Sequence, residues 1–259
     1  MPKDYALDNS WDRARRRLSL LEQYLDPMTR RRMSALGLRE GWQCLEVGAG
    51  GGSIASWLGE QVGASGSVLA TDINVALLDI IRSANVRTQQ HDILHDPLPE
   101  DAFDLVHSRW LLHHLRDPET AIHRMVSATR PGGWVLIEDV DFFPVHASAS
   151  AAYREFMTAL VNTVVEASGR DCFWARALPE IVAAMDVEEI GGEGDFPIIR
   201  GGSPLAEFFA ISAEQMRERL LQAGAIDASR LEHALDLLAS PDFWGFGGGG
   251  VSVWARRRA

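Results

Sequence analysis

A glycine-rich turn between an apolar strand and a helix is the first segment that could bind a ligand. It reads CLEVGAGGG over residues 44–52, with glycine at positions 48, 50 and 52. Glycine lets the backbone turn sharply and approach a ligand with no side chain between them. Ser53 could cap the helix that begins at Ile54. The turn predicts a site where bare backbone contacts a nucleotide-like ligand, and a flexible surface turn is the alternative.

An acidic residue follows the second expected strand at the distance typical of a ribose contact. Asp72 ends the segment SVLATD, and a carboxylate there can accept hydrogen bonds from both ribose hydroxyls. The dinucleotide pattern G-x-G-x-x-G would put its third glycine at position 53, where this chain has serine. The spacing is instead E-x-G-x-G-x-G, and residues 41–81 hold four acids and no lysine or arginine. A ligand with a positive charge would suit that setting better.

Two adjacent histidines, His113 and His114, are the residues best suited to move a proton near neutral pH. They lie in the segment RWLLHH, which we predict to be helical over 109–115. On a helix His113 would share a face with Arg109, and His114 a face with Trp110. One of them could then face the ligand as a general base. A packing role is the alternative for each, and His113 is the better candidate for the base.

Apolar runs and helical stretches alternate through the first half of the chain and must position these residues. Strands are expected at 43–47, 67–71, 86–90, 103–107 and 133–138, and helices at 10–36, 53–62, 75–83, 109–115 and 119–129. This alternation predicts βαβ units and a mostly parallel sheet with helices on both faces. The segment RPGGW stops the last of these helices before the fifth strand.

The second half of the chain has a different pattern. Residues 148–185, 204–223 and 227–239 are expected to be helical, and DVEEI and FPIIR look like a strand pair. The alternating apolar residues Val251 and Val253 predict a last strand that pairs antiparallel beside the sheet. A helical piece that interrupts an α/β alternation often covers a ligand crevice, because open α/β sheets bind ligands at the carboxyl ends of their strands.

Net charge, apolar runs and cysteine content exclude several classes of protein. The chain has 259 residues and a net charge of −11, which repels nucleic-acid backbones, so no nucleic-acid partner is expected. The arginine runs at 13–17 and 30–32 are expected on solvated helix faces. With no signal peptide, no apolar run of about 18 residues and only Cys44 and Cys172 as cysteines, we expect a cytoplasmic protein without a membrane span or a disulfide framework.

Five motifs in order carry a family resemblance over about residues 40–140. They read LEVGAGGG, ATDI, QQHDIL, FDLVHSRWLLHHLRDP and RPGGWVLIED. Together they resemble the class I S-adenosylmethionine-dependent methyltransferases, of the small-molecule type similar to the ubiquinone and menaquinone biosynthesis C-methyltransferases. The resemblance implies a Rossmann-like α/β fold and S-adenosyl-L-methionine as the cofactor.

The resemblance also implies which residues hold that cofactor. Asp72 would hold the ribose hydroxyls with Ile73 on the adenine, Asp92 would take the adenine amino group, and Ser108 and Arg109 would line the methionine end. The full set of implied cofactor residues is Glu46, Gly48, Ala49, Gly50, Gly52, Asp72, Ile73, Asp92, Ile93, Ser108 and Arg109.

Three acids, Glu138, Asp139 and Asp141, follow the fifth expected strand, where a substrate would lie. They could contact the substrate or cap helices, and Asp141 is a further candidate catalytic residue. Catechol-type methyltransferases bind a metal with such acids, but their pattern also needs an acid after the fourth strand. This chain has His-Ser-Arg at 107–109 instead, so we expect no metal. Aromatic residues could line the acceptor pocket or pack in the core, namely Phe142, Phe143, Phe173 and Trp174.

The predicted reaction is methyl transfer to an oxygen, nitrogen or activated carbon of a small-molecule acceptor, such as a secondary metabolite or a quinone-like compound. One alternative is a protein of this fold that retains the cofactor and catalyses cyclisation. Another is a nicotinamide-dependent oxidoreductase, but the chain has a single lysine, Lys3, and no Tyr-x-x-x-Lys pair. A homodimer is left open.

The predicted organisation is a single methyltransferase domain in four parts. Residues 1–38 form an N-terminal helical lid and 39–145 the cofactor-binding core. Residues 146–185 form a helical insertion, and 186–259 add the strands and helices that complete the sheet. The acceptor pocket is expected between residues 1–35 and 146–185, because variable segments at strand ends build specificity on a fixed scaffold.

Overall fold

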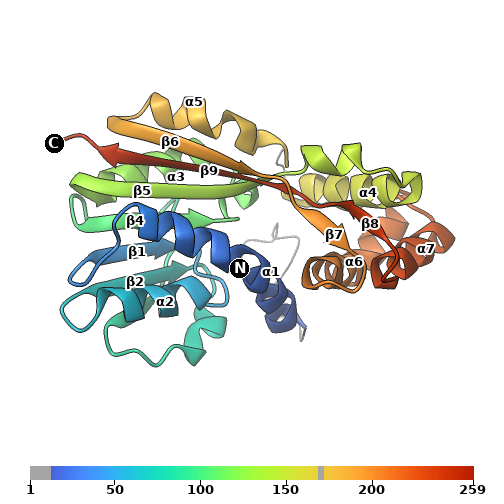
Figure 1. Ribbon diagram of the computed structural model, residues 1–259, viewed down its shortest axis with the longest axis horizontal. Helices are drawn as coiled ribbons and strands as arrows, with labels where there is room; N and C mark the ends of the chain where they lie inside the picture. The colour runs from blue at the N-terminus through green and yellow to red at the C-terminus, as the bar shows by residue number, and fades with distance from the viewer. Residues whose placement is uncertain (1–12, 169–171) are drawn as a thin grey trace. The chain divides into compact units, whose positions relative to one another are not determined.

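A seven-stranded sheet is the centre of the fold in the computed structural model, which describes residues 13–168 and 172–259 (Figure 1). Its strands lie in the order β3-β2-β1-β4-β5-β9-β6. In chain order the strands of this sheet are β1 (Gln43–Val47), β2 (Ser67–Asp72), β3 (Val86–Gln90), β4 (Phe103–Arg109), β5 (Thr129–Asp141), β6 (Val187–Asp195) and β9 (Gly249–Arg257).

The first five strands confirm the predicted parallel sheet. β1 pairs in parallel with both β2 and β4, β2 with β3, and β4 with β5. The order of strands reverses between β1 and β4, and ligands of open α/β sheets bind at such a switch point, outside the carboxyl ends of the strands. The glycine turn after Val47 and the residues at the end of β4 meet there, because Val47 lies opposite Ser108 in the register.

The C-terminal strands complete the sheet, with one difference from prediction. β9 lies beside β5 and is antiparallel to the first five strands, as the alternation of Val251 and Val253 predicted. The expected pairing of DVEEI with FPIIR is wrong. The first becomes β6, whose neighbour is the long strand β9, and the second becomes β7 (Ile198–Arg200), which pairs with β8 (Trp244–Phe246) in a separate antiparallel ribbon. Pro197 separates β6 from β7 and has no N–H for a ladder.

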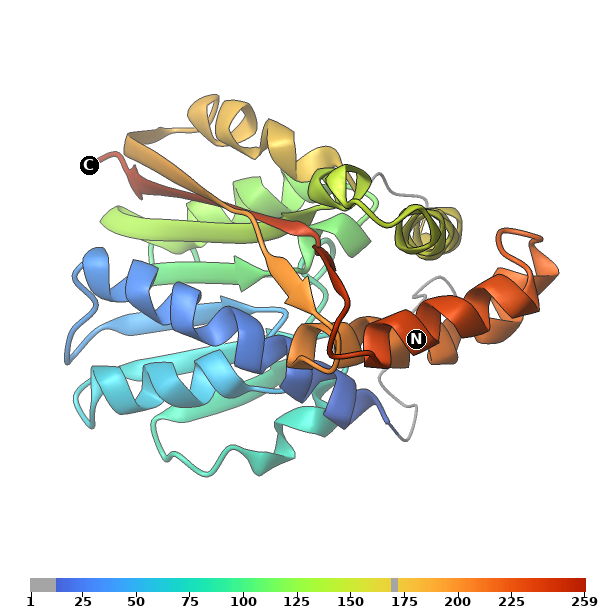
Figure 2. The same cartoon turned by 45° about the vertical axis from the view of Figure 1, so that its right-hand side comes forward.

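Seven α-helices and four 3₁₀ helices are assigned within the described residues. The α-helices are α1 (Ala14–Ala35), α2 (Ser53–Val62), α3 (Pro118–Ala128), α4 (Ala151–Ser168), α5 (Leu178–Ala183), α6 (Pro204–Gln222) and α7 (Ala228–Ala239). The 3₁₀ helices are η1 (Val75–Ile80), η2 (Leu112–His114), η3 (Phe143–Ala147) and η4 (Trp174–Ala177). Figures 1 and 2 show α2 on one face of the strands and α3 on the other, as βαβ units require.

Two expected boundaries differ from the structure around the fourth and fifth strands. The helix predicted over 109–115 is absent, because β4 continues to Arg109 and only the single 3₁₀ turn η2 follows. Trp110 between them has φ of 51°, a left-handed conformation that cannot continue a strand or a right-handed helix. Likewise RPGGW lies inside β5, which begins at Thr129, directly after α3.

The core beneath α2 is apolar and fully buried. Ile54 and Leu58 of α2 pack on Cys44 of β1 and Leu105 of β4, all exposed by 2% or less. Cys44 is a small core residue, and burial raises the pKa of its thiol. Both cysteines are free and buried, so no disulfide supports the fold.

Helix α1 buries arginine, contrary to the expectation that both arginine runs coat solvated faces. Arg17 and Arg32 are 2% and 4% exposed. Among the apolar residues at helical spacing in this segment, Leu25 is buried, Leu18, Leu21 and Met28 are half-buried, and Trp11 lies outside the described residues. Pro27 stands inside the helix without ending it. The buried residues of α1 are therefore a mixture of apolar and polar side chains, and the partners of the polar ones are described below.

The chain divides into two compact units. The sheet unit comprises Leu25–Asp139, Arg176–Glu193 and Val251–Ala259, and the helical unit comprises Met1–Tyr24, Val140–Ala175 and Gly194–Gly250. In the helical unit α4, α6 and α7 pack against one another (Figure 2). None of the described helices combines the length and apolar character needed to cross a membrane. The boundaries predicted for the lid and the insertion, which include residues 1–12 and 169–171 outside the description, stay predictions.

Candidate active site

The glycine turn presents bare backbone at the switch point. Gly50 and Gly52 have φ of 56° and 86°, in the left-handed region where a side chain is strained. A Cβ at Gly52 would come within 2.9 Å of the Ile81 side chain, so that glycine is required for packing. A Cβ at Gly50 would meet nothing closer than 4.0 Å, the carbonyl oxygen of Gly48, so the turn is open there. A ligand can approach the backbone at Gly50.

Asp72 is joined directly to this turn. Its Oδ2 accepts the backbone N–H of Gly50 at 2.9 Å, and its Oδ1 accepts that of Asn74 at 2.9 Å. Burial raises the pKa of Asp72, and the hydrogen bonds from Asn74, Gly50 and Ile73 oppose the rise. Ile73 is 44% exposed, which leaves its side chain available to a planar ring.

The other residues expected to hold the cofactor follow β1 and β3, at the carboxyl ends of the parallel strands. The amides of Gly48 and Ala49 both donate to the carbonyl of Thr71, at 2.8 and 2.9 Å, which ties the turn to the end of β2. Asp92 follows β3, and its Oδ1 accepts the N–H of Leu94 at 2.9 Å, while Ile93 is 4% exposed. Asp92 is thus engaged in its own turn and Ile93 is mostly covered.

Ser108 supplies a polar atom that fits a polar ligand. Its side chain is fully buried at the end of β4, and its Oγ has no hydrogen-bond partner among the residues that the structure describes. Buried hydroxyls are normally bonded, so an unbonded one beside an open backbone turn indicates a site for a further donor or acceptor. The opening at Gly50 and this hydroxyl are compatible with a ligand that carries polar groups.

Glu46 does not face open space in the structure. It is 3% exposed, and its Oε2 lies 2.6 Å from Nδ1 of His107, its neighbour across the β1–β4 pair. The predicted contact of the Glu46 side chain with a cofactor would be made while Oε2 bonds His107. It stays a prediction, and the observed partner of Glu46 is His107.

A buried charge network continues from His107 to the underside of α1. Nε2 of His107 lies 3.2 Å from Glu138, whose Oε1 accepts from Arg32 at 2.7 Å and from Ser252 at 3.1 Å. Thr29 donates to Oε2 of Glu138 at 2.5 Å. Four side chains from three elements thus satisfy one carboxylate, as a buried charge requires.

The network fixes the charge of its two central groups. Burial alone would lower the pKa of His107, but the adjacent Glu46 and Glu138 carboxylates raise it to about 9. Burial alone would raise the pKa of Glu138, but His107, Thr29 and Arg32 lower it to about 2. Near neutral pH the pair is therefore imidazolium and carboxylate.

Arg109 binds two residues of α1 in the same region. Its guanidinium donates to Asp26 at 2.9 Å and to Thr29 at 3.0 Å. Asp26 also accepts from Arg30 at 2.9 Å and from the hydroxyl of Ser53 at 3.0 Å. The expectation that Ser53 caps α2 is therefore wrong. Gly52 is the N-cap, and no side chain caps that helix end.

We expect the free energy of unfolding to fall as the pH rises from 6.5 to about 9, the ordinary and folded pKa values of His107. Because the folded state binds this proton more tightly, its stabilising effect is complete below 6.5 and is lost as the pH passes the folded pKa. Urea unfolding of wild type and His107→Gln across this range measures the effect, with the exposed His123→Gln as control. Equal pH slopes in wild type and His107→Gln would contradict it.

His113 forms a pair with Asp139 rather than sharing a helical face with Arg109. Nδ1 of His113 lies 2.6 Å from Oδ1 of Asp139, and the His113 backbone N–H donates to Oδ2 at 2.8 Å. The structure records no hydrogen bond from Nε2 to a described residue, and 6% of the side chain remains exposed. The ring of His114 lies against it, with centroids 3.7 Å apart. The carboxylate holds this imidazole in one orientation.

The turn that carries His113 lies against the glycine turn. A Cβ at Gly48 would come within 3.0 Å of the Leu111 side chain, which therefore packs directly on the Gly48 backbone. Trp110, just before this turn, has a strained left-handed backbone, and such strain is typical of functional sites. Asp141, the third catalytic candidate, belongs to the helical unit, where its Oδ1 accepts the N–H of Phe143 at 2.8 Å. It thus binds the first N–H of η3, whose N-cap residue is Phe142.

The sequence did not predict the buried network that joins His107 and Glu138 to α1. Sequence reasoning named His107 only as a residue that is not a metal ligand, and it assigned no role to Thr29 or Arg32. The usable signal was the presence of charged residues inside otherwise apolar strands, FDLVHSR and WVLIEDVD, which require buried partners. Within residues 13–168 and 172–259, no cluster of three histidine, cysteine, aspartate or glutamate side chains is arranged to hold a metal.

The sheet order, the switch point and the glycine turn bonded to Asp72 define a class I methyltransferase. Residues 12–178 match the model of a methyltransferase domain family, described as "Methyltransferase domain", and the chain belongs to that family. S-adenosylmethionine is the cofactor of these enzymes.

The chain is similar to several known methyltransferases. It is 30% identical to methyltransferase str2 of Strobilurus tenacellus, over 73% of this chain and 68% of that protein. It is 31% identical to the ubiquinone/menaquinone biosynthesis C-methyltransferase UbiE of Idiomarina loihiensis, over 45% and 49%. The chain spans about half the length of most of the curated relatives that it matches.

A solved structure has the same fold. Phosphoethanolamine N-methyltransferase 2 of Haemonchus contortus, in complex with S-adenosyl-L-methionine, superposes with a TM-score of 0.55 at 17% identity. The match covers 94% of this chain and 52% of that one. At this identity the likeness concerns the fold.

Proposed function

We propose that this chain transfers a methyl group from S-adenosylmethionine to an oxygen, nitrogen or activated carbon of a small molecule. The contact of Asp72 with the amide of Gly50 carries the proposal, because it joins an acid and open backbone at the switch point. The name of the UbiE relatives, biosynthesis of ubiquinone and menaquinone, favours a quinone-like or secondary-metabolite acceptor.

The bound cofactor supplies an electrophilic methyl group on a positively charged sulfur. Asp72 would accept the ribose hydroxyls, Ile73 would cover the adenine, and the Oγ of Ser108 would bond a polar group of the methionine part. Asp92 and the glycine turn complete the proposed set. Holding the acceptor, methyl and sulfur in line can supply several kcal/mol by proximity alone.

His113 would take the acceptor's proton as the methyl group arrives. Asp139 binds Nδ1, so a neutral imidazole carries its proton there and has its lone pair on Nε2, which has no hydrogen bond to a described residue. A carboxylate that holds the tautomer and stabilises the resulting imidazolium is a recurring feature of general bases. A hydroxyl or amine acceptor needs this help, whereas an activated carbon needs it less.

Replacing Asp72 by alanine is expected to weaken S-adenosylmethionine binding at least tenfold. The carboxylate would accept two ribose hydrogen bonds, and bonds to charged groups contribute about 1.5–3 kcal/mol each. Calorimetry on wild type, Asp72→Ala and the control Asp79→Ala, an exposed acid seven residues on, measures the loss. Unchanged affinity in Asp72→Ala, with a normal melting temperature, would mean that the crevice is misassigned.

The same calorimetry separates the alternatives. Wild type should bind S-adenosylmethionine and S-adenosylhomocysteine and bind NAD weakly, and tighter NAD binding would favour an oxidoreductase. A cyclase that retains the cofactor would bind it equally well. It would form no S-adenosylhomocysteine when incubated with candidate acceptors and labelled cofactor, so product formation decides between the two.

A further inference from the structure

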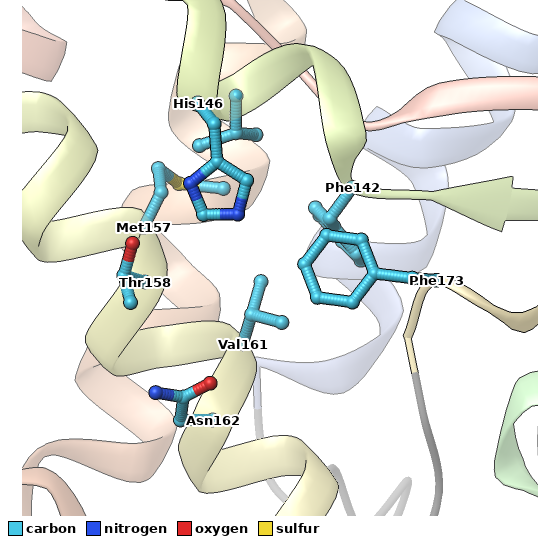
Figure 3. A pocket seen from close by; sticks show the side chains of 8 residues that line it. Phe142, His146, Met157, Thr158, Val161, Asn162 and Phe173 are labelled. Atoms are coloured by element: carbon cyan, nitrogen blue, oxygen red, sulfur yellow. The ribbon is translucent and has the colours of Figure 1, made fainter.

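The hollow that η3 and α4 form within the helical unit is too small for an organic ring (Figure 3). Phe142 and Phe173 stand on one side of it and Met157 on the other, with Val161 between them. The described residues enclose about 70 Å³ there, roughly half of the cavity of about 150 Å³ that holds one benzene ring. The switch point at the ends of β1 and β4 is the better place for an organic ligand.

Asp26 joins three elements at this switch point. It lies on the part of α1 that belongs to the sheet unit, and its side chain is only 12% exposed. Its Oδ1 accepts the hydroxyl of Ser53 at 3.0 Å and a guanidinium N–H of Arg109 at 2.9 Å. Ser53 begins α2 directly after the glycine turn, and Arg109 ends β4. One carboxylate oxygen therefore connects the two segments between which a ligand of this sheet would lie.

The same carboxylate offsets positive charge that α1 and β4 bring to the start of α2. Residues 41–81, which include the glycine turn and α2, contain no lysine or arginine. The Arg109 side chain is 11% exposed, and the other oxygen of Asp26 accepts from Arg30 at 2.9 Å. The Arg30 guanidinium also lies over the ring of Trp57 in α2, 5.6 Å from its centroid. Without the Asp26 carboxylate, both guanidinium charges would lose the acid that they share.

This balance of charge affects a cationic ligand more than a neutral one. S-adenosylmethionine carries a positive sulfonium, whereas the sulfur of S-adenosylhomocysteine is a neutral thioether. The two molecules share the adenosine and the amino-acid part. A change in the charge of the site therefore alters their relative affinity, whereas a loss of shape or packing weakens the binding of both.

We propose that Asp26 is a positioning residue for the cofactor and acts through Arg109. Its carboxylate holds the guanidinium on α1, ties α1 to the start of α2, and offsets the charge that would repel a sulfonium. When the methyl group passes to the acceptor, the sulfur keeps the electron pair of the broken bond and loses its charge. The product then loses the attraction of the carboxylate, which favours its exchange for new cofactor. This role of Asp26 rests on the proposed methyl transfer.

Calorimetric titration of the full chain with S-adenosylmethionine and S-adenosylhomocysteine tests the role of Asp26. Asp26→Asn removes the charge at nearly equal size. The ratio of the Kd for S-adenosylmethionine to that for S-adenosylhomocysteine should rise at least about threefold, because charges within a Debye length of about 8 Å are only partly screened. The rise should be smaller in 1 M salt, where the Debye length is about 3 Å.

Two further variants separate charge from packing. Asp26→Glu keeps the charge and should keep the wild-type ratio of Kd values, even if both affinities fall. Glu60→Gln is the matched control, because Glu60 is an exposed acid on α2, about 10 Å along the helix from Ser53. Its ratio should equal that of wild type.

Arg109→Gln tests whether Asp26 acts through the guanidinium, and it carries the test if Asp26→Asn does not fold. Removal of this cation should lower the ratio at least about threefold, the opposite of the effect of Asp26→Asn. The double variant Asp26→Asn/Arg109→Gln loses one charge of each sign and should return the ratio to near the wild-type value, as coupled residues do in a double-mutant cycle.

The outcomes distinguish the role of Asp26 from the proposed reaction. If wild type binds both ligands and Asp26→Asn weakens both equally or neither, Asp26 is a structural residue only and methyl transfer still stands. An unchanged ratio in Arg109→Gln would also overturn the role of the pair. If wild type binds neither ligand, the proposed methyl transfer itself is overturned, and the role of Asp26 with it.

Discussion

Replacing His113 by glutamine is expected to lower turnover by about 10²–10⁴-fold, the usual range for loss of a general base. Glutamine can still donate to the Asp139 carboxylate, which accepts from His113 at 2.6 Å, so it limits the damage to packing. Affinity for S-adenosylmethionine should stay nearly unchanged, because the cofactor does not need the His113 imidazole. Turnover, cofactor affinity and melting temperature are the measurements.

The adjacent histidine provides the control. His114→Gln should affect the melting temperature more than the rate, because the proposed proton transfer uses the imidazole that Asp139 orients. Asp139→Asn should also reduce turnover, since the carboxylate that orients the His113 imidazole is lost. Full activity in His113→Gln would leave positioning alone as the mechanism and would direct attention to Glu138, Asp139 and Asp141.

Replacing Arg32 by methionine is expected to lower the free energy of unfolding by about 3–5 kcal/mol, the usual cost of breaking a buried ion pair. The Arg32 and Glu138 side chains are only 4% and 5% exposed, and methionine would leave the carboxylate without its nearest cation. Methionine keeps much of the aliphatic part of the arginine side chain. The expected loss of stability therefore comes mainly from the missing guanidinium charge. Urea unfolding with a check that the slope is unchanged measures it.

A neighbouring arginine on the same helix provides the matched comparison. Arg31 also pairs with an acid, Glu193, but its side chain is 56% exposed. Arg31→Met should cost less than about 1 kcal/mol, because solvent screens exposed pairs. If the two variants unfold alike, the buried network does not hold α1 in place, and the polar underside of that helix has another purpose.

Regular elements of the sheet unit were predictable because their signals are local. The glycine turn after Val47 ends one strand and starts one helix within a few residues, so β1 and α2 match their predicted bounds. The segment after β4 was predicted as a helix over 109–115, on which His113 would share a face with Arg109. The left-handed backbone at Trp110 prevents that helix, and the adjacent β5 strand prolongs β4 by pairing Arg109 with Glu138.

The side-chain partners of the site were not predictable in the same way. Ser53 looked like a cap from its position, but its hydroxyl donates to Asp26, 27 residues earlier. Glu46 looked like a ligand contact, yet its carboxylate bonds His107, 61 residues later. Such pairings depend on which helix lies over which strand. The cofactor candidates at Gly50 and Asp72 were more accessible to sequence reasoning, because one fixed strand order brings them together.

The position of β9 inside the sheet has a consequence for biosynthesis. β6 lies at the edge of the order and has β9 as its neighbour, but β9 begins at Gly249, 54 positions after β6 ends at Asp195. At about 5–20 residues per second, a ribosome needs roughly 3–10 s to make that stretch. During this time β5 has an open edge and β6 has no partner in this sheet, so nascent chains expose two unpaired strands. Unpaired strands readily join other chains, and this interval is when the protein is most in need of a chaperone.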